Sequence, residues 1–227
     1  MAILDNWRRF QADMNEAAER YHRRMDEIRV MAVSKTRSAD EIRSARDAGL
    51  DLFGENRVGE AEEKFAVLDP DRYPLVLIGH LQSNKVARIS GRFSAVHSVD
   101  SLRLAEKLSR HRDSIGAPLE VLIQVNTSGE SRKSGFSDYG EFLESAQRIA
   151  ELPGLRLKGV MTMAPFVDDE SVVRRCFAEC RRWGQAAANW TDGDPVLSMG
   201  MSSDFQWAVA EGSTMLRIGS RLFGSRE

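Results

Sequence analysis

Eight short apolar segments alternate with longer, helix-like segments along this chain, and this alternation limits the fold more than any other feature of the sequence. Strands that alternate with helices form parallel sheets, because each helix carries the chain back to begin the next strand. The expected strands lie at about residues 28–33, 51–53, 75–78, 95–99, 119–125, 155–161, 196–198 and 215–218. The sequence therefore predicts an α/β protein.

Helix signals fill the segments between the expected strands. Apolar residues recur at three- and four-residue spacing over residues 7–25, which predicts an opening helix before the first strand. Ser38 and Glu41 have the spacing of a capping box, in which both side chains accept hydrogen bonds from backbone N–H groups where a helix begins. Ser203 and Gln206 have the same spacing, so another helix is predicted to begin there.

Eight strand–helix units are typical of a closed barrel. Nine residues follow Ile218, too few for a full eighth helix, and the opening helix would cover that gap. The alternative is an open doubly wound sheet, but the chain lacks the Gly-x-Gly-x-x-Gly turn that would support it. We therefore expect one domain over residues 1–227, a single (β/α)8 TIM-type barrel with an extra N-terminal helix.

Composition excludes several classes of function. Lys and Arg total 32 and Asp and Glu total 34, so the near-neutral charge does not favour nucleic acid or an anionic membrane as a partner. Cys176 and Cys180 are expected to be free thiols, because their spacing matches neither a disulfide framework nor a zinc site. No signal peptide and no apolar run of about 18 residues is evident. We expect a cytoplasmic protein, and a monomer.

Barrel proteins place their sites at the carboxyl ends of the strands, and Lys35 follows the first expected strand directly. Desolvation at such a position favours the neutral amine, which can attack an aldehyde and form a Schiff base. The alternative is a lysine whose ammonium extends into solvent.

The last two loops carry small and hydroxyl-bearing residues. Gly200 and Gly219 would let backbone N–H groups approach a ligand, and Ser202, Ser203 and Ser220 offer hydroxyl donors. The helix expected after Ser203 would point its N-terminus at the same place. These features predict a phosphate site, the alternative being ordinary glycine turns with a serine cap.

Four further polar residues lie at strand ends. Arg217 falls inside the last apolar run, and a buried arginine needs a partner, either a ligand nitrogen or anion, or an internal carboxylate. Asn56, His80 and Asn126 could line the site or could equally satisfy backbone groups of their own loops.

Two charged segments near these ends have structural interpretations. Glu55 could pair with Lys35 or with Lys85. Arg132 and Lys133 are expected to lie in a solvated loop rather than at an anion site.

Several motifs in one order resemble the pyridoxal phosphate homeostasis protein family of the YggS/PROSC type. The matching segments are AVSKT (32–36), FGEN (53–56), IGHLQSNK (78–85), IQVNTSGE (123–130), KSGF (133–136), GVMTM (159–163), LSMGMS (197–202), RIGS (217–220) and FG (223–224). The resemblance covers about residues 28–224, and a set of motifs in order is more specific than any one of them.

The resemblance implies a barrel similar to the N-terminal domain of alanine racemase, with pyridoxal 5′-phosphate as cofactor. It implies six cofactor contacts: Lys35 as the covalent Schiff base, Arg217 near the pyridine nitrogen, Asn56 lining the pocket, and Ser202, Gly219 and Ser220 on the phosphate. The chain departs from the family pattern at Arg57, where an aromatic residue is common, and at Leu75 and Val76, where Trp-His is common.

An arginine at the pyridine nitrogen argues against strong catalysis, because it does not readily donate the proton that makes the ring an electron sink. A racemase of this architecture also uses a tyrosine from a second domain, for which the chain is too short. Its three tyrosines, Tyr21, Tyr73 and Tyr139, do not fall at the expected strand ends.

We therefore expect a protein that binds pyridoxal phosphate and supports vitamin B6 and amino-acid homeostasis without robust turnover, exchanging the cofactor with apoenzymes. One alternative is a racemase-like pyridoxal phosphate enzyme acting on amino acids. Another is an aldolase that uses Lys35 on a phosphorylated sugar without a cofactor.

Overall fold

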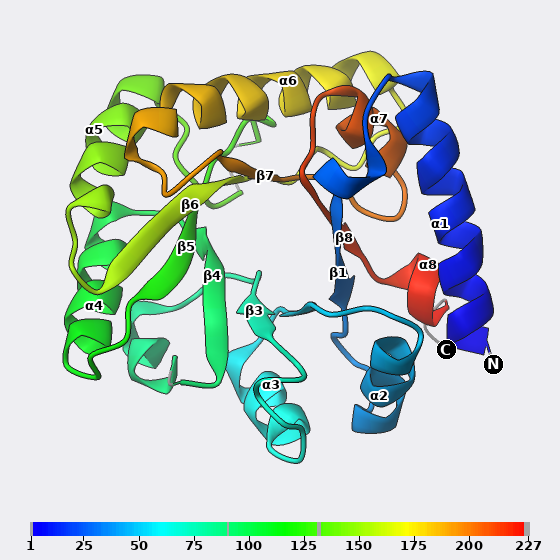
Figure 1. The fold of residues 1–227 in the computed structure, drawn as a ribbon. Helices are drawn as coiled ribbons and strands as arrows, with labels where there is room; N and C mark the ends of the chain where they lie inside the picture. Colours follow the sequence, from blue (N-terminus) through cyan, green and yellow to red (C-terminus); the bar gives the residue numbers. More distant parts are fainter. Residues whose placement is uncertain (1, 90, 131–132, 225–227) are drawn as a thin grey trace.

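The computed structural model describes residues 2–89, 91–130 and 133–224, and its strands close into one parallel barrel in the order β1 to β8 (Figure 1). β8 pairs with β1, and this closes the ring. The strands are β1 (Arg29–Val33), β2 (Phe53–Glu55), β3 (Leu75–Leu77), β4 (Phe93–Val99), β5 (Leu119–Gln124), β6 (Leu155–Met161), β7 (Val196–Ser198) and β8 (Met215–Ile218). The predicted (β/α)8 barrel is confirmed, and the open sheet is not formed.

Helices surround the barrel on the outside (Figure 1). They are α1 (Ala2–Arg20), α2 (Ala39–Asp47), α3 (Val58–Phe65), α4 (Leu102–Asp113), α5 (Tyr139–Ala150), α6 (Glu170–Ala186), α7 (Phe205–Ala210) and α8 (Ser220–Phe223). The described residues also form three short 3-10 helices, η1 (Met25–Glu27), η2 (Ser83–Arg88) and η3 (Ala188–Trp190). Within the described ranges, no helix has the length and apolar character needed to cross a membrane.

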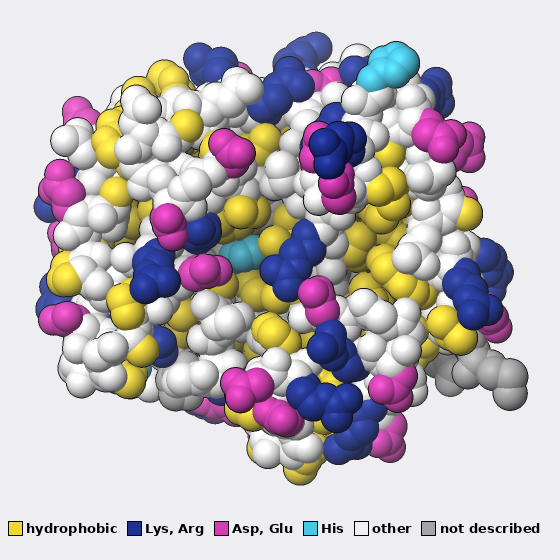
Figure 2. Space-filling model, in the orientation of Figure 1, with side chains coloured by type: hydrophobic (Ala, Val, Ile, Leu, Met, Phe, Trp, Pro, Cys, Tyr) yellow, Lys and Arg dark blue, Asp and Glu magenta, His cyan; other side chains and the backbone are white. Residues whose placement is uncertain are grey.

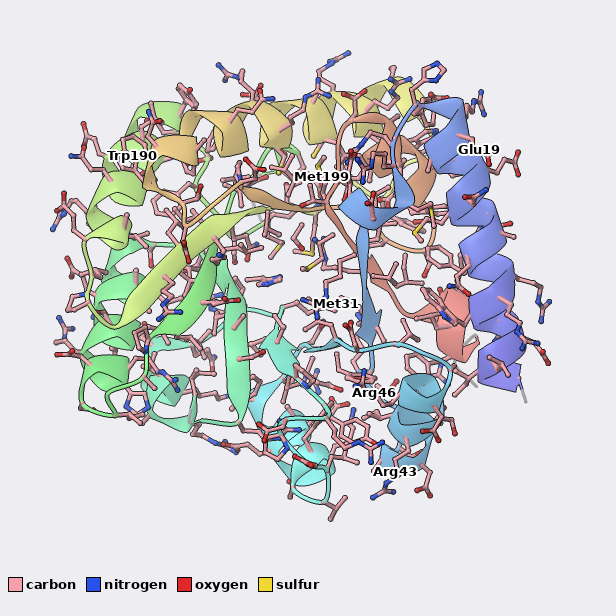
Figure 3. The ribbon with its side chains drawn as sticks, viewed as in Figure 1. Glu19, Met31, Arg43, Arg46, Trp190 and Met199 are labelled. Atoms are coloured by element: carbon pink, nitrogen blue, oxygen red, sulfur yellow. The ribbon has the colours of Figure 1, made fainter. Side chains whose placement is uncertain are left out.

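Two apolar cores hold the barrel together. The larger one lies between the strands and the outer helices, and the smaller one fills the inside of the barrel with Met31, Leu52, Val76, Ala95 and Met215. Figure 3 shows Met31 within the ring of strands, whereas Glu19, Arg43 and Arg46 lie on outer helices. In β1, β3 and β8, alternate residues therefore serve the two cores, as the pleat requires.

The opening helix α1 covers the gap left by the short α8, as predicted. It packs against α7 and α8, and Figure 1 shows it beside α8. Phe10 of α1 is buried and meets the ring of Phe205 of α7 edge-on, with the centroids 5.0 Å apart. The side-chain amide of Asn6 donates to the carbonyl oxygen of Leu222 at 2.9 Å.

The two predicted capping boxes have different outcomes. The Ser38 hydroxyl accepts the Glu41 N–H at 3.2 Å and the Glu41 carboxylate accepts the Ser38 N–H at 2.7 Å, so the first box is confirmed. The box predicted at Ser203 is wrong, because α7 begins at Phe205 and its N-cap, Asp204, makes no side-chain cap. The Asp204 carboxylate instead accepts the N–H of Met201 at 2.5 Å.

Replacing Phe10 by alanine tests whether α1 is part of the barrel's core. The substitution opens a cavity between α1 and α7, so we expect Phe10→Ala to lower the free energy of unfolding by about 3–5 kcal/mol. Leu4→Ala on the same helix is the control, since Leu4 is an exposed hydrophobic residue and should cost less than about 1 kcal/mol. Urea unfolding curves for both variants measure this, and equal losses would contradict the role given to α1.

Candidate cofactor site

A cavity of about 750 Å³ opens at the carboxyl ends of the strands. This volume falls in the range typical of small-molecule sites, about 300–1,000 Å³. All six residues that the resemblance predicted at the cofactor line it, namely Lys35, Asn56, Ser202, Arg217, Gly219 and Ser220. Figure 2 shows a hollow near the centre of the face in view, with hydrophobic and histidine side chains inside and charged side chains around its rim.

Lys35 lies in a tight turn directly after β1. The Arg37 N–H donates to the Ser34 carbonyl oxygen at 3.0 Å across this turn, and the Lys35 side chain is half-buried and lines the cavity. Thr36 adopts a left-handed conformation with φ of 64°. This conformation is unfavourable for a β-branched residue, so the surrounding structure must hold the turn in place.

Buried charges lie beside this turn. The structure pairs Glu55 with Lys64 at 2.8 Å, a partner that the sequence did not suggest. Lys64 also pairs with Glu60 at 3.0 Å. Burial raises the pKa of Glu55, although Lys64 and Ser34 act in the opposite direction. Lys64 lies on helix α3, away from the strand ends that the sequence reasoning searched, so only the folded geometry shows its position.

The loops after β7 and β8 meet at the predicted phosphate site. The Arg221 N–H donates to the Ser202 hydroxyl oxygen at 3.4 Å, and the Arg221 guanidinium donates from Nε to the Ser202 carbonyl oxygen at 3.0 Å. Ser220 is exposed at the start of α8, and Gly219 precedes it. Two hydroxyl groups and a glycine backbone thus converge at one edge of the cavity, which suits a phosphate.

Two other residues predicted at this phosphate site have different surroundings. Gly200 is buried, with φ of 94°, and a Cβ there would overlap Ala208 of α7. Close packing against α7 therefore explains why this position is a glycine. Ser203 lines the cavity. However, the buried Asp204 carboxylate lies at the N-terminus of α7, and a negative charge already there weakens the case for an anion at this helix.

Arg217 projects into the barrel from β8 and is 4% exposed. Its Nη1 donates to the carbonyl oxygen of Ser198 at 2.5 Å and to the Ser198 hydroxyl at 2.9 Å, and its Nη2 donates to the carbonyl oxygen of Thr162 at 2.7 Å. Burial lowers the pKa of Arg217 to about 10, so it remains charged at neutral pH. These acceptors are neutral oxygens, and no carboxylate of the described residues is bonded to the guanidinium, which was the predicted alternative.

His97 of β4 is also buried close to this charge. Burial, and then the charge of Arg217, lower the pKa of His97 to about 3, so the imidazole is neutral. Its Nδ1 is buried without a hydrogen-bond partner in the described part of the chain. The sequence reasoning missed this residue, because it lies inside a strand rather than at a strand end.

The three remaining polar residues separate into two groups. Asn56 and His80 line the cavity, and His80 Nδ1 lies 3.0 Å from an oxygen of Asp100, a partner from the end of β4. Asn126 serves its own loop, because its amide donates to the carbonyl oxygens of Glu130 and Lys133. Asn126 thus has the structural role that sequence reasoning left open for it.

Lys133 corrects the expectation of a solvated loop. It lines the cavity, donates to the Ala164 carbonyl oxygen at 3.1 Å and pairs with Glu130 at 2.5 Å. Arg132 lies outside the described residues. Arg57, where the family often has an aromatic residue, is exposed. Lys133 is a second amine in the same cavity, so any assignment of chemistry to Lys35 needs a test that separates the two.

This set of groups fits pyridoxal phosphate chemically. The cavity has an amine for the aldehyde at the end of β1, a buried cation inside the barrel, and hydroxyl groups with a glycine backbone for the phosphate. The buried guanidinium shows the fit most directly, because Arg217 donates to other described residues from Nη1 and Nη2 and not from Nε. A ligand acceptor could take that position.

The barrel and its lysine-containing cavity define a protein of the alanine racemase type. The sequence model of the family described as "Alanine racemase, N-terminal domain" matches residues 5–227. The pyridoxal phosphate homeostasis protein of Escherichia coli K12 is 41% identical over 231 residues, covering 99% of this chain and 97% of that protein. The protein of the same name from Pseudomonas aeruginosa is 39% identical over 225 residues, covering 99% and 96%.

A solved structure of PipY from Synechococcus elongatus PCC7942, with pyridoxal phosphate bound, superposes with a TM-score of 0.83 at 31% identity. The match covers 98% of this chain and 100% of that one. The chain therefore belongs to the alanine racemase N-terminal domain family and, within it, to the pyridoxal phosphate homeostasis proteins.

The neutral His97 predicts how the free energy of unfolding depends on pH. An unfolded histidine has a pKa of about 6.5, whereas folded His97 has a pKa of about 3. At pH values between these two pKa values, His97 binds a proton in the unfolded chain but not in the folded chain. The residue should therefore lower the free energy of unfolding as pH falls through this window, by up to about 1.4 kcal/mol per pH unit.

The matched variant is His97→Gln, which keeps a polar side chain but does not titrate. Urea unfolding at pH 7.5 and at pH 5.0 should show a smaller loss of stability for the variant than for the natural chain. Equal losses in the two proteins would contradict a buried, neutral His97.

Proposed function

We propose that the chain binds pyridoxal 5′-phosphate as a reversible Schiff base on Lys35 and acts in vitamin B6 and amino-acid homeostasis without robust turnover. The observation that carries this proposal is that Lys35, Arg217 and the Ser202–Gly219–Ser220 group line one cavity. The relatives named pyridoxal phosphate homeostasis protein and the structure of PipY with the cofactor support the same function. Pyridoxal phosphate supplies an aldehyde for the amine and an electron sink when protonated.

The surroundings of the cavity favour cofactor handling over catalysis. Arg217 keeps its positive charge at neutral pH, so it does not supply a proton to a ring nitrogen. The three tyrosines, all in the described part of the chain, are absent from the cavity lining. A proton-transferring tyrosine opposite Lys35 is therefore not available from this chain.

A racemase-like enzyme acting on amino acids is the second candidate. One observation favours it: His80 lines the cavity and its Nδ1 lies 3.0 Å from the Asp100 carboxylate, an arrangement that can move protons. Steady turnover of an amino acid by the purified chain, abolished by Lys35→Ala, would support this candidate over a handling protein.

The cavity is open at the strand ends and charged side chains surround it (Figure 2), which suits exchange of the cofactor with apoenzymes. We propose that residues 1–227 act as one cofactor-binding barrel domain, as a monomer in the cytoplasm, with no nucleic acid or membrane as partner.

Lys35→Ala tests the proposed attachment. The natural chain mixed with pyridoxal phosphate should develop the visible absorbance of a protonated Schiff base, and borohydride followed by peptide mapping should place the label on Lys35. The variant should lose both signals, because no amine remains at that position. Lys107→Ala, at an exposed position of α4, should behave as the natural chain does.

The same measurement separates the alternatives. A label on Lys133 would contradict the assignment to Lys35. Absence of the absorbance, with borohydride trapping of a sugar phosphate on Lys35, would instead support the aldolase.

Ser220→Ala tests the proposed phosphate contact. Loss of one hydrogen bond to a charged group should weaken cofactor binding about tenfold or more. The free energy of unfolding should stay within about 0.5 kcal/mol, because the side chain is exposed. Ser114→Ala, at an exposed position after α4, is the control, and equal affinities of the two variants in a titration would rule the contact out.

A further inference from the structure

Lys64 joins the two residues that flank Lys35 to one ion cluster, in which Glu55 and Lys64 are buried and Glu60 is partly exposed. Its ammonium donates to the Ser34 carbonyl oxygen at 2.7 Å, to Glu55 Oε1 at 2.8 Å and to Glu60 Oε1 at 3.0 Å. An ammonium has three hydrogens, so these three acceptors use its full capacity. The acceptors come from the turn after β1, from β2 and from α3.

Both sides of the Lys35 turn are bonded to this cluster. On one side, the Ser34 hydroxyl donates to Glu55 Oε1 at 2.6 Å. On the other side, the Thr36 N–H donates to Glu60 Oε1 at 2.5 Å. Glu60 is thus the acceptor for a residue whose left-handed backbone is unfavourable by itself. The cluster holds the backbone immediately before and immediately after the cofactor-binding lysine.

Removing these charges from water costs free energy, which indicates that the cluster has a specific structural role. Glu55 is fully buried and the Lys64 side chain is 9% exposed. Charges removed from water need excellent geometry to offset the loss of hydration, and apolar residues of similar size often stabilise a fold equally well. Oε2 of Glu55 has no hydrogen-bond partner in the described part of the chain. General stability therefore does not explain the cluster, whereas precise placement of the turn does.

We propose that Lys64 is a positioning residue that holds the Lys35 turn in the conformation from which the Lys35 amine reacts with an aldehyde in the cavity. This inference rests on the proposed function of Lys35 and adds a residue on α3, outside the cavity lining. A fixed turn limits the directions available to the Lys35 side chain, and misplacement of a reacting group by about 1 Å can cost a hundredfold. The guanidinium of arginine would not replace the compact ammonium among three converging acceptors.

The test compares two ligands that share a ring and a phosphate. Pyridoxal 5′-phosphate has an aldehyde, whereas pyridoxine 5′-phosphate has an alcohol in its place and cannot form a Schiff base. Lys64→Met keeps most of the side-chain volume but removes the ammonium. We expect about a tenfold or greater loss of affinity for the aldehyde, with a matching loss of borohydride label on Lys35, and less than about a twofold change for the alcohol.

Two further variants keep the test decisive. Lys64→Met leaves the Glu55 charge without its partner and could unfold the chain, so the double variant Glu55→Gln/Lys64→Met removes both charges together. It should fold, and it should show the same selective loss for the aldehyde. Lys107→Met, at an exposed position of α4, is the control for loss of a lysine and should bind both ligands as the natural chain does.

The outcomes separate this inference from the function on which it rests. Equal aldehyde affinity and equal Lys35 label in the double variant and the natural chain would overturn the positioning role. Equal losses for both ligands would also overturn it, because they would show general damage to the cavity. Absence of label on Lys35 in the natural chain would overturn the proposed function, and this inference with it.

Discussion

Pairing between the first and last strands is the constraint on which the site depends. β1 and β8 are joined in parallel register, with Met31 opposite Arg217 and Ala32 opposite Ile218. This closure brings the turn that carries Lys35 beside the loop that carries Gly219, although the two are far apart in sequence. A Cβ on Gly219 would lie 3.4 Å from the carbonyl oxygen of Val33, which shows how closely the two loops approach. The Lys35 amine and the proposed phosphate site therefore face one cavity only because the barrel is closed.

The inside of the barrel is divided into an apolar part and a polar part. Met31 and its apolar neighbours fill one part, and the Arg217 guanidinium lies next to it, where it is bonded to neutral oxygens of Ser198 and Thr162. A buried charge that lacks a bonded carboxylate keeps its capacity to attract a ligand. The neutral His97 adds no second positive charge beside Arg217.

The fold was largely predictable from the sequence because the signal repeats. Eight apolar runs separated by helix-like segments specify a parallel barrel even where single boundaries shift, as at the second strand, expected at 51–53 and found at Phe53–Glu55. The six predicted site residues line one cavity for a different reason, namely ordered motifs at strand ends, and their contacts with a cofactor stay predictions. Side-chain partners were not predictable. Glu55 pairs with Lys64, and Asp204 rather than Ser203 stands at the start of α7, because these choices depend on distances between segments that spacing along the chain does not encode.

The central claim is that one amine, held at the end of the first strand, captures an aldehyde whose phosphate is bound by the last two loops. A crystal structure of the chain grown with pyridoxal phosphate tests it most directly. The account predicts continuous density from Lys35 Nζ to the ring, with the phosphate among Ser202, Gly219 and Ser220. A phosphate bound elsewhere, or an unmodified Lys35 beside a bound ring, would contradict it.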